Sequence, residues 1–364
     1  MPVYLDNNAS THLDPRVLEA MLPYLSGPHA NPSSVHRYGR MARDAVEAAR
    51  HQVARLVNAQ PQDLVWTSGG TESNNLAVKG AVGSGRVLYG ATEHPAVMEA
   101  AESLGAEAIA VNGNGHVRWP EFEMQIKKAP VKLVSLMRAN NETGVIQDVA
   151  RAVQLARAAG ALMHVDAVQA AGKIAVDFAA LDCDLMSLSS HKLYGPKGIG
   201  ALVVRSGTEL RPLHHGGPQE RGLRGGTENV AGIVGFGVAA ELALDELERR
   251  QAFLLKLRTQ LEAGLKTIAG LTIFAVAVER LPNTVQFGVE GFEGEALLLE
   301  LDKRGMAVSS GSACASGSRE PSHVLLAMGL PRALAQSAIR VSLGQNNTEA
   351  EVAQFLVALK AVLQ

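Results

Sequence analysis

Short apolar runs alternate with helical segments along most of the chain, and this alternation restricts the possible folds more than any other feature. The runs have the length and composition of buried strands, and glycine turns or amphipathic stretches separate them. Repeated alternation of strand and helix predicts a mostly parallel sheet covered by helices. The expected strands are residues 64–67, 87–89, 107–111, 131–137, 161–165, 185–188 and 201–204. We therefore expect an α/β protein.

The composition argues against several classes of protein. The chain has 364 residues. A single hydrophobic core usually supports fewer residues than this, so we expect two domains. Its 34 basic and 36 acidic side chains nearly cancel, which argues against binding to nucleic acid or to a membrane surface. The first residues lack a basic and apolar leader, and no apolar run is long enough to span a membrane. The two cysteines have no metal-ligand spacing, so we expect no disulfide framework, no metal site and a reducing, cytoplasmic location.

The C-terminal third has the pattern of a second, smaller lobe. We expect a long helix over about 229–268, broken or bent near the glycines at 232, 235 and 237, to connect the two parts. The elements expected beyond it are strands at 284–287 and 339–343 and helices at 294–304 and 349–363. This lobe is expected to begin near Leu271.

Lys192 lies between a polar run and a glycine-rich turn, directly after an expected strand. Open α/β sheets bind their ligands at such strand ends. A single lysine is usually a solvated surface group, but Asp166 ends another apolar run and Gln169 follows three positions later. An amine that can form a Schiff base, together with an acid for a pyridinium nitrogen, is the arrangement that pyridoxal phosphate requires. The residues therefore favour this cofactor.

A second segment offers a place for the phosphate of such a cofactor. An expected strand leads into Gly70 and Thr71 at the start of a helix, where backbone N–H groups and a hydroxyl are available to an anion. This turn alone is weak evidence, because most such turns only cap a helix. Ser189 and His191, beside the lysine, could donate to the same anion.

His94 and Asn141 follow two other expected strands. Since His94 precedes a proline at a strand exit, its imidazole could lie flat over an aromatic cofactor ring, but an ordinary loop histidine is the simpler interpretation. Asn141 lies in a polar cluster, where it could contact the cofactor or a substrate carboxylate, or merely stabilise a turn. The residues alone leave both alternatives open.

A loop of small residues carries one of the two cysteines. From Ser309 to Ser318 nearly every side chain is small, so the loop cannot anchor a core and is expected to be mobile and to expose Cys314. An exposed free thiol is easily oxidised, which favours a reactive role over a packing role. Cys183 precedes an apolar run and is better explained as a small buried side chain.

Taken together, the motifs resemble those of the cysteine desulfurases of the NifS and IscS kind. The resemblance runs in order from Leu5 to about Gly344, and the interval from Asp166 to Lys192 agrees with that family. Separate motifs that recur in the right sequence make the match highly specific. They are residues 31–36, 70–73, 92–94, 140–142, 164–169, 190–192, 221–227 and 309–316.

The resemblance implies a homodimer with the class V aminotransferase fold, which is fold type I of the pyridoxal phosphate enzymes. A large domain at residues 13–255, with a mostly parallel seven-stranded sheet, would bind pyridoxal 5'-phosphate. A smaller α+β domain would combine residues 1–12 with residues 256–364 and carry the mobile cysteine loop.

The resemblance also implies how each residue would meet the cofactor. Lys192 would form the Schiff base and move the substrate α-proton. Asp166 would hold the pyridine nitrogen protonated, Gln169 would bond the phenolic oxygen, and His94 would stack on the ring and shuttle a proton. The phosphate would be held by Gly70, Thr71, Ser189 and His191, and by the partner subunit's Thr227.

The implied activity converts L-cysteine to L-alanine, and the sulfur passes to Cys314 as a persulfide. Asn141 and Arg340 would hold the substrate carboxylate by charge-assisted hydrogen bonds. The persulfide would serve iron–sulfur cluster assembly or another sulfur-transfer pathway through an acceptor protein. The chain stops soon after its expected terminal helix, which leaves the acceptor open. Three alternatives remain: a selenocysteine lyase, a related pyridoxal phosphate aminotransferase or lyase, and a scaffold without catalytic activity.

Overall fold

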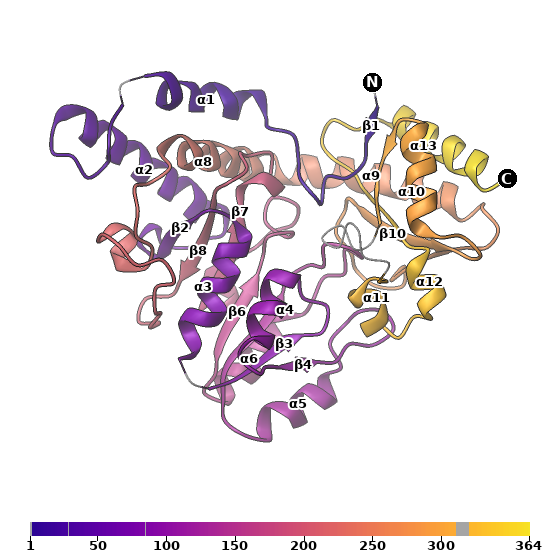
Figure 1. Cartoon of the computed structure of the whole chain (residues 1–364), viewed down its shortest axis with the longest axis horizontal. Coiled ribbons are helices and arrows are strands. Elements are labelled where there is room, and N and C mark those ends of the chain that lie inside the picture. The colour runs from indigo at the N-terminus through magenta and orange to yellow at the C-terminus, as the bar shows by residue number, and fades with distance from the viewer. Residues whose placement is uncertain (1, 28, 84, 311–319) are drawn as a thin grey trace.

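The computed structural model describes residues 2–27, 29–83, 85–310 and 320–364. Figure 1 shows a large sheet with helices around it and, to one side, a smaller group of strands and helices. Both ends of the chain lie on the side of this smaller group (Figure 1). Within the described ranges, no helix is both long and apolar enough to cross a membrane.

A seven-stranded sheet forms the centre of the large part, as predicted. Its strands are β2 (Leu64–Thr67), β3 (Arg86–Gly90), β4 (Glu107–Ile109), β5 (Val131–Met137), β6 (Leu162–Asp166), β7 (Leu185–Ser189) and β8 (Gly200–Val204). Their order is β2-β8-β7-β6-β5-β3-β4, and β8 alone runs antiparallel to its neighbours in this sheet. Every residue of β2, β7 and β8 is buried, because helices cover both faces.

The helices of the large part pack through apolar faces that recur at helical spacing. They are α1 (Pro15–Ser26), α2 (Arg37–Leu56), α3 (Gly70–Val82), α4 (Pro95–Glu102), α5 (Trp119–Lys127), α6 (Val149–Ala158), α7 (Phe178–Leu181) and α8 (Val230–Asp245). In α2 the buried face includes Ala42, Val46, Ala49 and Val53. This face packs against α8, and α1 packs on α8 as well.

The predicted long helix over 229–268 is instead two helices, and its glycines do not bend it. The chain breaks at Glu246, between α8 and α9 (Leu247–Leu265), where the carboxylate binds Arg16 at 2.9 Å and Arg250 at 2.7 Å. The glycines lie inside α8 and permit close packing. At Gly237 a Cβ atom would approach the Ala49 Cα atom of α2 to 2.7 Å. The glycine pattern therefore reflects helix–helix contact.

The smaller part contains two sheets of its own. Its elements are β1 (Val3–Tyr4), β9 (Leu271–Ile273), β10 (Thr284–Val289), α10 (Gly294–Lys303), β11 (Met306–Ala307), β12 (Ser309–Ser310), α11 (His323–Ala327), α12 (Arg332–Gln336), β13 (Ile339–Ser342) and α13 (Glu349–Val362). The order β12-β13-β10-β9 forms one sheet, and β1 pairs with β11 in the other. The N-terminal strand thus joins the C-terminal part. The predicted domain limit at residue 255 falls inside α9, and the division itself stays a prediction.

The parallel strands bring five polar segments to one edge of the large sheet. Strands β2, β3, β5, β6 and β7 run in the same direction, so the residues that follow them meet at their carboxyl ends. These segments carry the residues that the sequence singled out. Because β8 runs antiparallel to β7, the segment that connects the two strands also lies at this edge of the sheet.

Candidate active site

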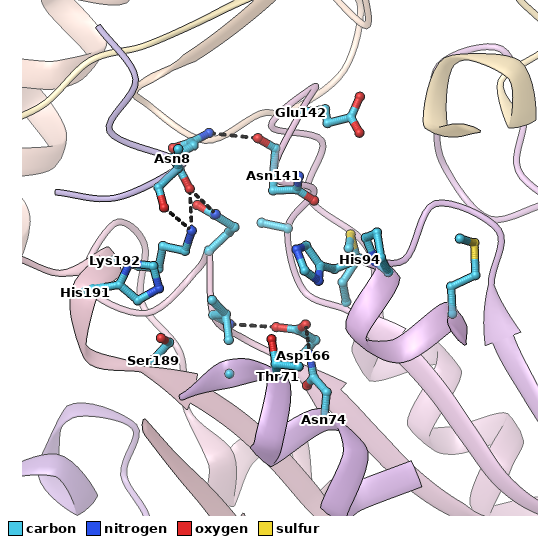
Figure 2. Close-up of a pocket in the computed structure, with 18 of the residues that line it drawn as sticks. Asn8, Thr71, Asn74, His94, Asn141, Glu142, Asp166, Ser189, His191 and Lys192 are labelled. Carbon is cyan, nitrogen blue, oxygen red and sulfur yellow. Dashed lines mark hydrogen bonds between the residues drawn. The ribbon is translucent and has the colours of Figure 1, made fainter. Parts of the chain in front are cut away.

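A pocket of about 660 Å³ lies at this edge of the sheet. Figure 2 shows Lys192 and His94 on opposite sides of the pocket, with Asp166, Thr71 and Asn74 below them in that view. The pocket brings together ten of the predicted residues, namely Gly70, Thr71, His94, Asn141, Asp166, Gln169, Ser189, His191, Lys192 and Arg340. Segments from both parts of the chain therefore form one site.

Two predicted residues are not among the lining residues. Thr227 is exposed on its own chain and does not line this pocket, so a role at the site would require a second copy of the chain. Cys314 lies outside the described residues. Cys183 is fully buried, as expected from the sequence, and burial raises the pKa of its thiol to about 12.

Lys192 ends a single turn of 3-10 helix, Ser190–Lys192, that directly follows β7. Its Nζ donates to the carbonyl oxygens of Asn8, at 2.6 Å, and of Ala9, at 2.8 Å. Both carbonyls belong to the N-terminal segment, which crosses the pocket beside the amine (Figure 2). The amine is therefore oriented by main-chain acceptors of the N-terminal segment.

Asp166 ends β6, and two donors hold its carboxylate in place. The Val168 N–H donates to Oδ1 at 2.9 Å, and Asn74 Nδ2 donates to Oδ2 at 2.7 Å. Glu93 is a second acid nearby, and it is completely buried. Burial, and then the charge of Asp166, raise the pKa of Glu93 well above its usual value. The environment of Glu93 thus favours the neutral form of its carboxyl group.

His94 caps the start of α4. Its Nδ1 accepts a hydrogen bond from the Ala96 N–H at 3.1 Å, so in the neutral ring the proton is on Nε2. Burial lowers the pKa of the His94 imidazole, and Lys192 and His323 add to that effect, while Asp166 opposes it. A neutral imidazole with an Nε2–H group therefore faces the pocket.

Four residues at the end of the pocket nearest α3 form a cradle for an anion. The Ser189 Oγ atom is buried and has no hydrogen-bond partner among the described residues. At Gly70, a Cβ atom would lie only 2.9 Å from the Val168 side chain, so any residue other than glycine would force Val168 to move. Thr71 follows in the first turn of α3, where backbone N–H groups attract anions. His191 Nδ1 lies 3.2 Å from Ser10 Oγ, and burial lowers the pKa of its imidazole to about 4.

These features fit pyridoxal 5'-phosphate. The pocket has an amine on one side, a fixed carboxylate at its base and a buried hydroxyl that lacks a partner among the described residues beside a helix N-terminus. These are the groups needed for the aldehyde carbon, the ring nitrogen and the phosphate.

Arg340 and Asn141 close the pocket on the side of the smaller part. Arg340 lies in β13 and is almost fully buried. Its Nη2 donates to Asp6 at 2.8 Å and its Nη1 to the Asn141 carbonyl at 3.1 Å, whereas Nε has no partner among the described residues. Arg340 thus presents a buried positive charge to the pocket, and the main chain of Asn141 helps to hold it.

Sequence reasoning missed several polar residues of this region. Asn8, Asn74 and His323 line the pocket, and Lys173 is buried and bonded to the lining residues Asn8 and Gln169. His323 Nε2 lies 2.9 Å from the Glu93 carbonyl and so connects α11 to the segment that carries His94. A polar run follows Leu5, and Lys173 lies four positions after Gln169. These signals were available, but nothing in the sequence places residue 8 beside residue 192.

The fold and the pocket define a class: an α/β protein with a lysine and a fixed carboxylate at the carboxyl edge of a mostly parallel sheet. The family model described as "Aminotransferase class-V" matches residues 3–355. The chain therefore belongs to this family, whose pyridoxal phosphate enzymes have fold type I.

Individual relatives agree with this assignment. A protein of Trichormus azollae named "Cysteine desulfurase" is 43% identical over 372 residues, which cover 100% of this chain and 93% of the relative. The solved structure of a NifS-like protein from Rickettsia africae ESF-5 superposes with a TM-score of 0.94 at 34% identity, covering 100% of this chain and 99% of the other. A structure described as SspA in complex with cysteine gives a TM-score of 0.82 at 34% identity, with 93% and 98% covered.

Proposed function

We propose that this chain is a cysteine desulfurase that depends on pyridoxal 5'-phosphate, converts L-cysteine to L-alanine and takes the sulfur on Cys314 as a persulfide. The observation that carries the proposal is the placement of Lys192, Asp166, His94 and Arg340 around one pocket that fits the cofactor. The relatives named as cysteine desulfurases and the SspA structure with cysteine support the substrate.

Each side of the pocket would hold one part of the cofactor. Lys192 would hold its aldehyde carbon, Asp166 its ring nitrogen in the protonated form, and Gln169 its phenolic oxygen. His94 would lie against the ring. Gly70, Thr71, Ser189 and His191 would hold the phosphate, and the partner subunit's Thr227 would complete that site. When bound, the cofactor withdraws electrons from the substrate α-carbon.

The residues of the chain would then bind the substrate and move its protons. The Arg340 guanidinium, with Asn141 beside it, would hold the substrate carboxylate. Lys192 Nζ would remove the α-proton. The Cys314 thiolate would attack the substrate sulfur, so that an S–S bond forms, the C–S bond breaks and the electron pair stays with the carbon fragment. That fragment regains the α-proton from Lys192, takes up the proton that the Cys314 thiol released, with His94 as the shuttle, and leaves as L-alanine.

A homodimer is part of the proposal. Large apolar side chains are exposed on neighbouring parts of the surface, and a soluble monomer rarely leaves such a group uncovered. They are Leu18, Leu22, Tyr24 and Leu25 of α1 and Tyr38 and Met41 of α2. A second chain that covers this face could also supply Thr227, which does not line the pocket of its own chain.

The persulfide would be passed to an acceptor protein, either an iron–sulfur scaffold or another sulfur carrier, in the cytoplasm. A reducing compartment suits an enzyme whose reaction needs a free thiol. A selenocysteine lyase shares most of these residues, so the ratio of turnover with cysteine to turnover with selenocysteine distinguishes the two functions.

The proposal is tested by purifying the protein with pyridoxal 5'-phosphate and supplying L-cysteine. A visible absorbance band of the bound cofactor is expected, together with alanine and, in the presence of a reducing thiol, sulfide in equal amounts. Absence of the band would contradict the proposed cofactor. A band without alanine and sulfide would favour the aminotransferase alternative.

Replacing Arg340 by glutamine tests the binding of the substrate carboxylate. We expect the KM for cysteine to rise by about 10- to 100-fold, because a buried charge-assisted contact is lost. Lysine at this position keeps the charge but not the forked geometry of the guanidinium group, so the KM of R340K should lie between those of wild type and R340Q. Steady-state kinetics give the result, and thermal unfolding of the variants measures the separate effect of losing the Asp6 contact. An unchanged KM in R340Q would remove Arg340 from the substrate site.

A further inference from the structure

Lys173 is a buried lysine that the proposed reaction does not use. It lies in the turn after β6, and its side chain is buried against the back of the pocket. Among the described residues it forms no ion pair with a carboxylate, and its hydrogen-bond partners there are neutral amide oxygens. Burial, and then the charges of Lys192 and Arg340, lower the pKa of its amine well below the usual value. Burying an amine without a counter-charge is costly, so a compensating role is expected.

The two partners of Lys173 are residues of the site itself. Nζ donates to Gln169 Oε1 at 2.5 Å and to Asn8 Oδ1 at 3.1 Å. Both oxygens therefore accept a hydrogen bond from the Lys173 amine. The contact at Gln169 Oε1 and the hydrogen bond from Gln169 Nε2 to the Asn8 carbonyl together set how the Gln169 amide is turned, because the opposite orientation would place its oxygen against that carbonyl. Gln169 Nε2 must therefore face away from Lys173.

The orientation of Gln169 decides what this residue offers to the pocket. One N–H of Nε2 donates to the Asn8 carbonyl at 3.0 Å. Nε2 makes no other hydrogen bond with a described residue, and Gln169 lines the pocket. A turned amide would present an acceptor oxygen instead.

Asn8 extends the same network to Lys192. Its carbonyl accepts from Gln169 Nε2 and from Lys192 Nζ (Figure 2). Its own amide is fixed as well, since Asn283 Nδ2 donates to Oδ1 at 3.0 Å and Nδ2 donates to Thr284 Oγ1 at 2.9 Å. Asn8 is thus held in place by several partners. The orientation of the Gln169 amide, by contrast, depends on two contacts, the Lys173 amine at its oxygen and the Asn8 carbonyl at its nitrogen.

We propose that Lys173 is a positioning residue that turns the Gln169 amide so that an N–H group faces the phenolic oxygen of the bound cofactor. This inference rests on the proposed function, because it needs pyridoxal 5'-phosphate in the pocket. An N–H group stabilises the deprotonated oxygen, whereas an amide oxygen in the same place would repel it. Lys173 would therefore influence the ionisation of the cofactor without touching it.

The test measures the pH dependence of the cofactor's visible absorbance, without substrate, in four proteins: wild type, K173M, Q169L and the double variant. Methionine has a similar length and no donor. We expect K173M to raise the pH midpoint by about one unit, because the oxygen loses its donor. Q169L should raise it at least as far, and K173M/Q169L should match Q169L alone, since both changes act through one hydrogen bond.

Three further variants separate this role from general damage to the protein. K173Q keeps an N–H donor, so its midpoint should stay close to that of wild type. K360M removes an exposed lysine of α13 and should change nothing. K173L is a second variant without a donor, for use if K173M does not fold as judged by circular dichroism of the apoprotein.

Two results would overturn the role of Lys173. One is a midpoint that K173M and K173L leave unchanged. The other is a double variant whose shift equals the sum of the single shifts, because independent effects add. A wild-type protein that shows no cofactor absorbance would instead contradict the proposed function, and with it the premise of this inference.

Discussion

Replacing Lys192 by alanine is expected to reduce turnover of L-cysteine by roughly three to four orders of magnitude. The amine would hold the cofactor and move the α-proton, and both functions are lost together. Lys173 cannot take over, because it is buried and its N–H groups are bound to Gln169 and Asn8. The measurements are alanine formation and the absorbance of the protein after gel filtration with pyridoxal 5'-phosphate.

Arginine at position 192 shows whether charge alone is enough. Arginine keeps a positive charge but is never deprotonated in a protein, so it can neither bond to the aldehyde nor accept the α-proton. K192R should be as inactive as K192A. K132A, which removes an exposed lysine of β5, serves as the matched control and should keep normal turnover. An active K192R would refute the assignment of the amine.

The second large effect is expected at Cys314, where alanine should abolish transfer of sulfur to the protein. Without the thiolate no S–S bond can form with the substrate, so we expect formation of sulfide and alanine to fall by about a thousandfold. Binding of the cofactor should be unaffected. Mass spectrometry of wild type after exposure to L-cysteine should find one added sulfur on the peptide that contains Cys314.

The other cysteine provides the control for this prediction. Cys183 is buried, and a thiol with a pKa near 12 does not form a thiolate at neutral pH. C183A should therefore keep its turnover and still carry the added sulfur. Full production of sulfide by C314A, or an added sulfur on Cys183, would disprove the assignment of the nucleophile.

The site was largely predictable because its residues follow strands. Lys192, Asp166 and His94 each come after an apolar run, and parallel strands necessarily bring such positions to one edge. Local sequence thus contains the information that places them in one pocket. The role of each residue, by contrast, came from the resemblance to a family, since the residues alone left His94 and Asn141 with simpler explanations.

Other features depended on contacts between distant segments and could not be predicted. The glycines of α8 suggested a bend, but close contact between α8 and α2 explains them, and only the packing of the two helices reveals it. At the break between α8 and α9, Glu246 forms an ion pair with Arg16 of α1, a contact that local sequence does not reveal. Asn8 and Lys173 had weak local signals, but their roles depend on a contact between Asn8 and residues far away in the sequence.

The contacts of the N-terminal segment restrict the order in which the parts of the pocket can form during folding. Residues 3–4 pair with residues 306–307, the Asn7 N–H donates to the Ser342 carbonyl, and Asn8 binds Asn283 and Thr284. During synthesis these first residues leave the ribosome long before their partners exist, so their contacts must form after translation is nearly complete. The carbonyls that orient Lys192 are therefore synthesised well before the segments that hold them in place.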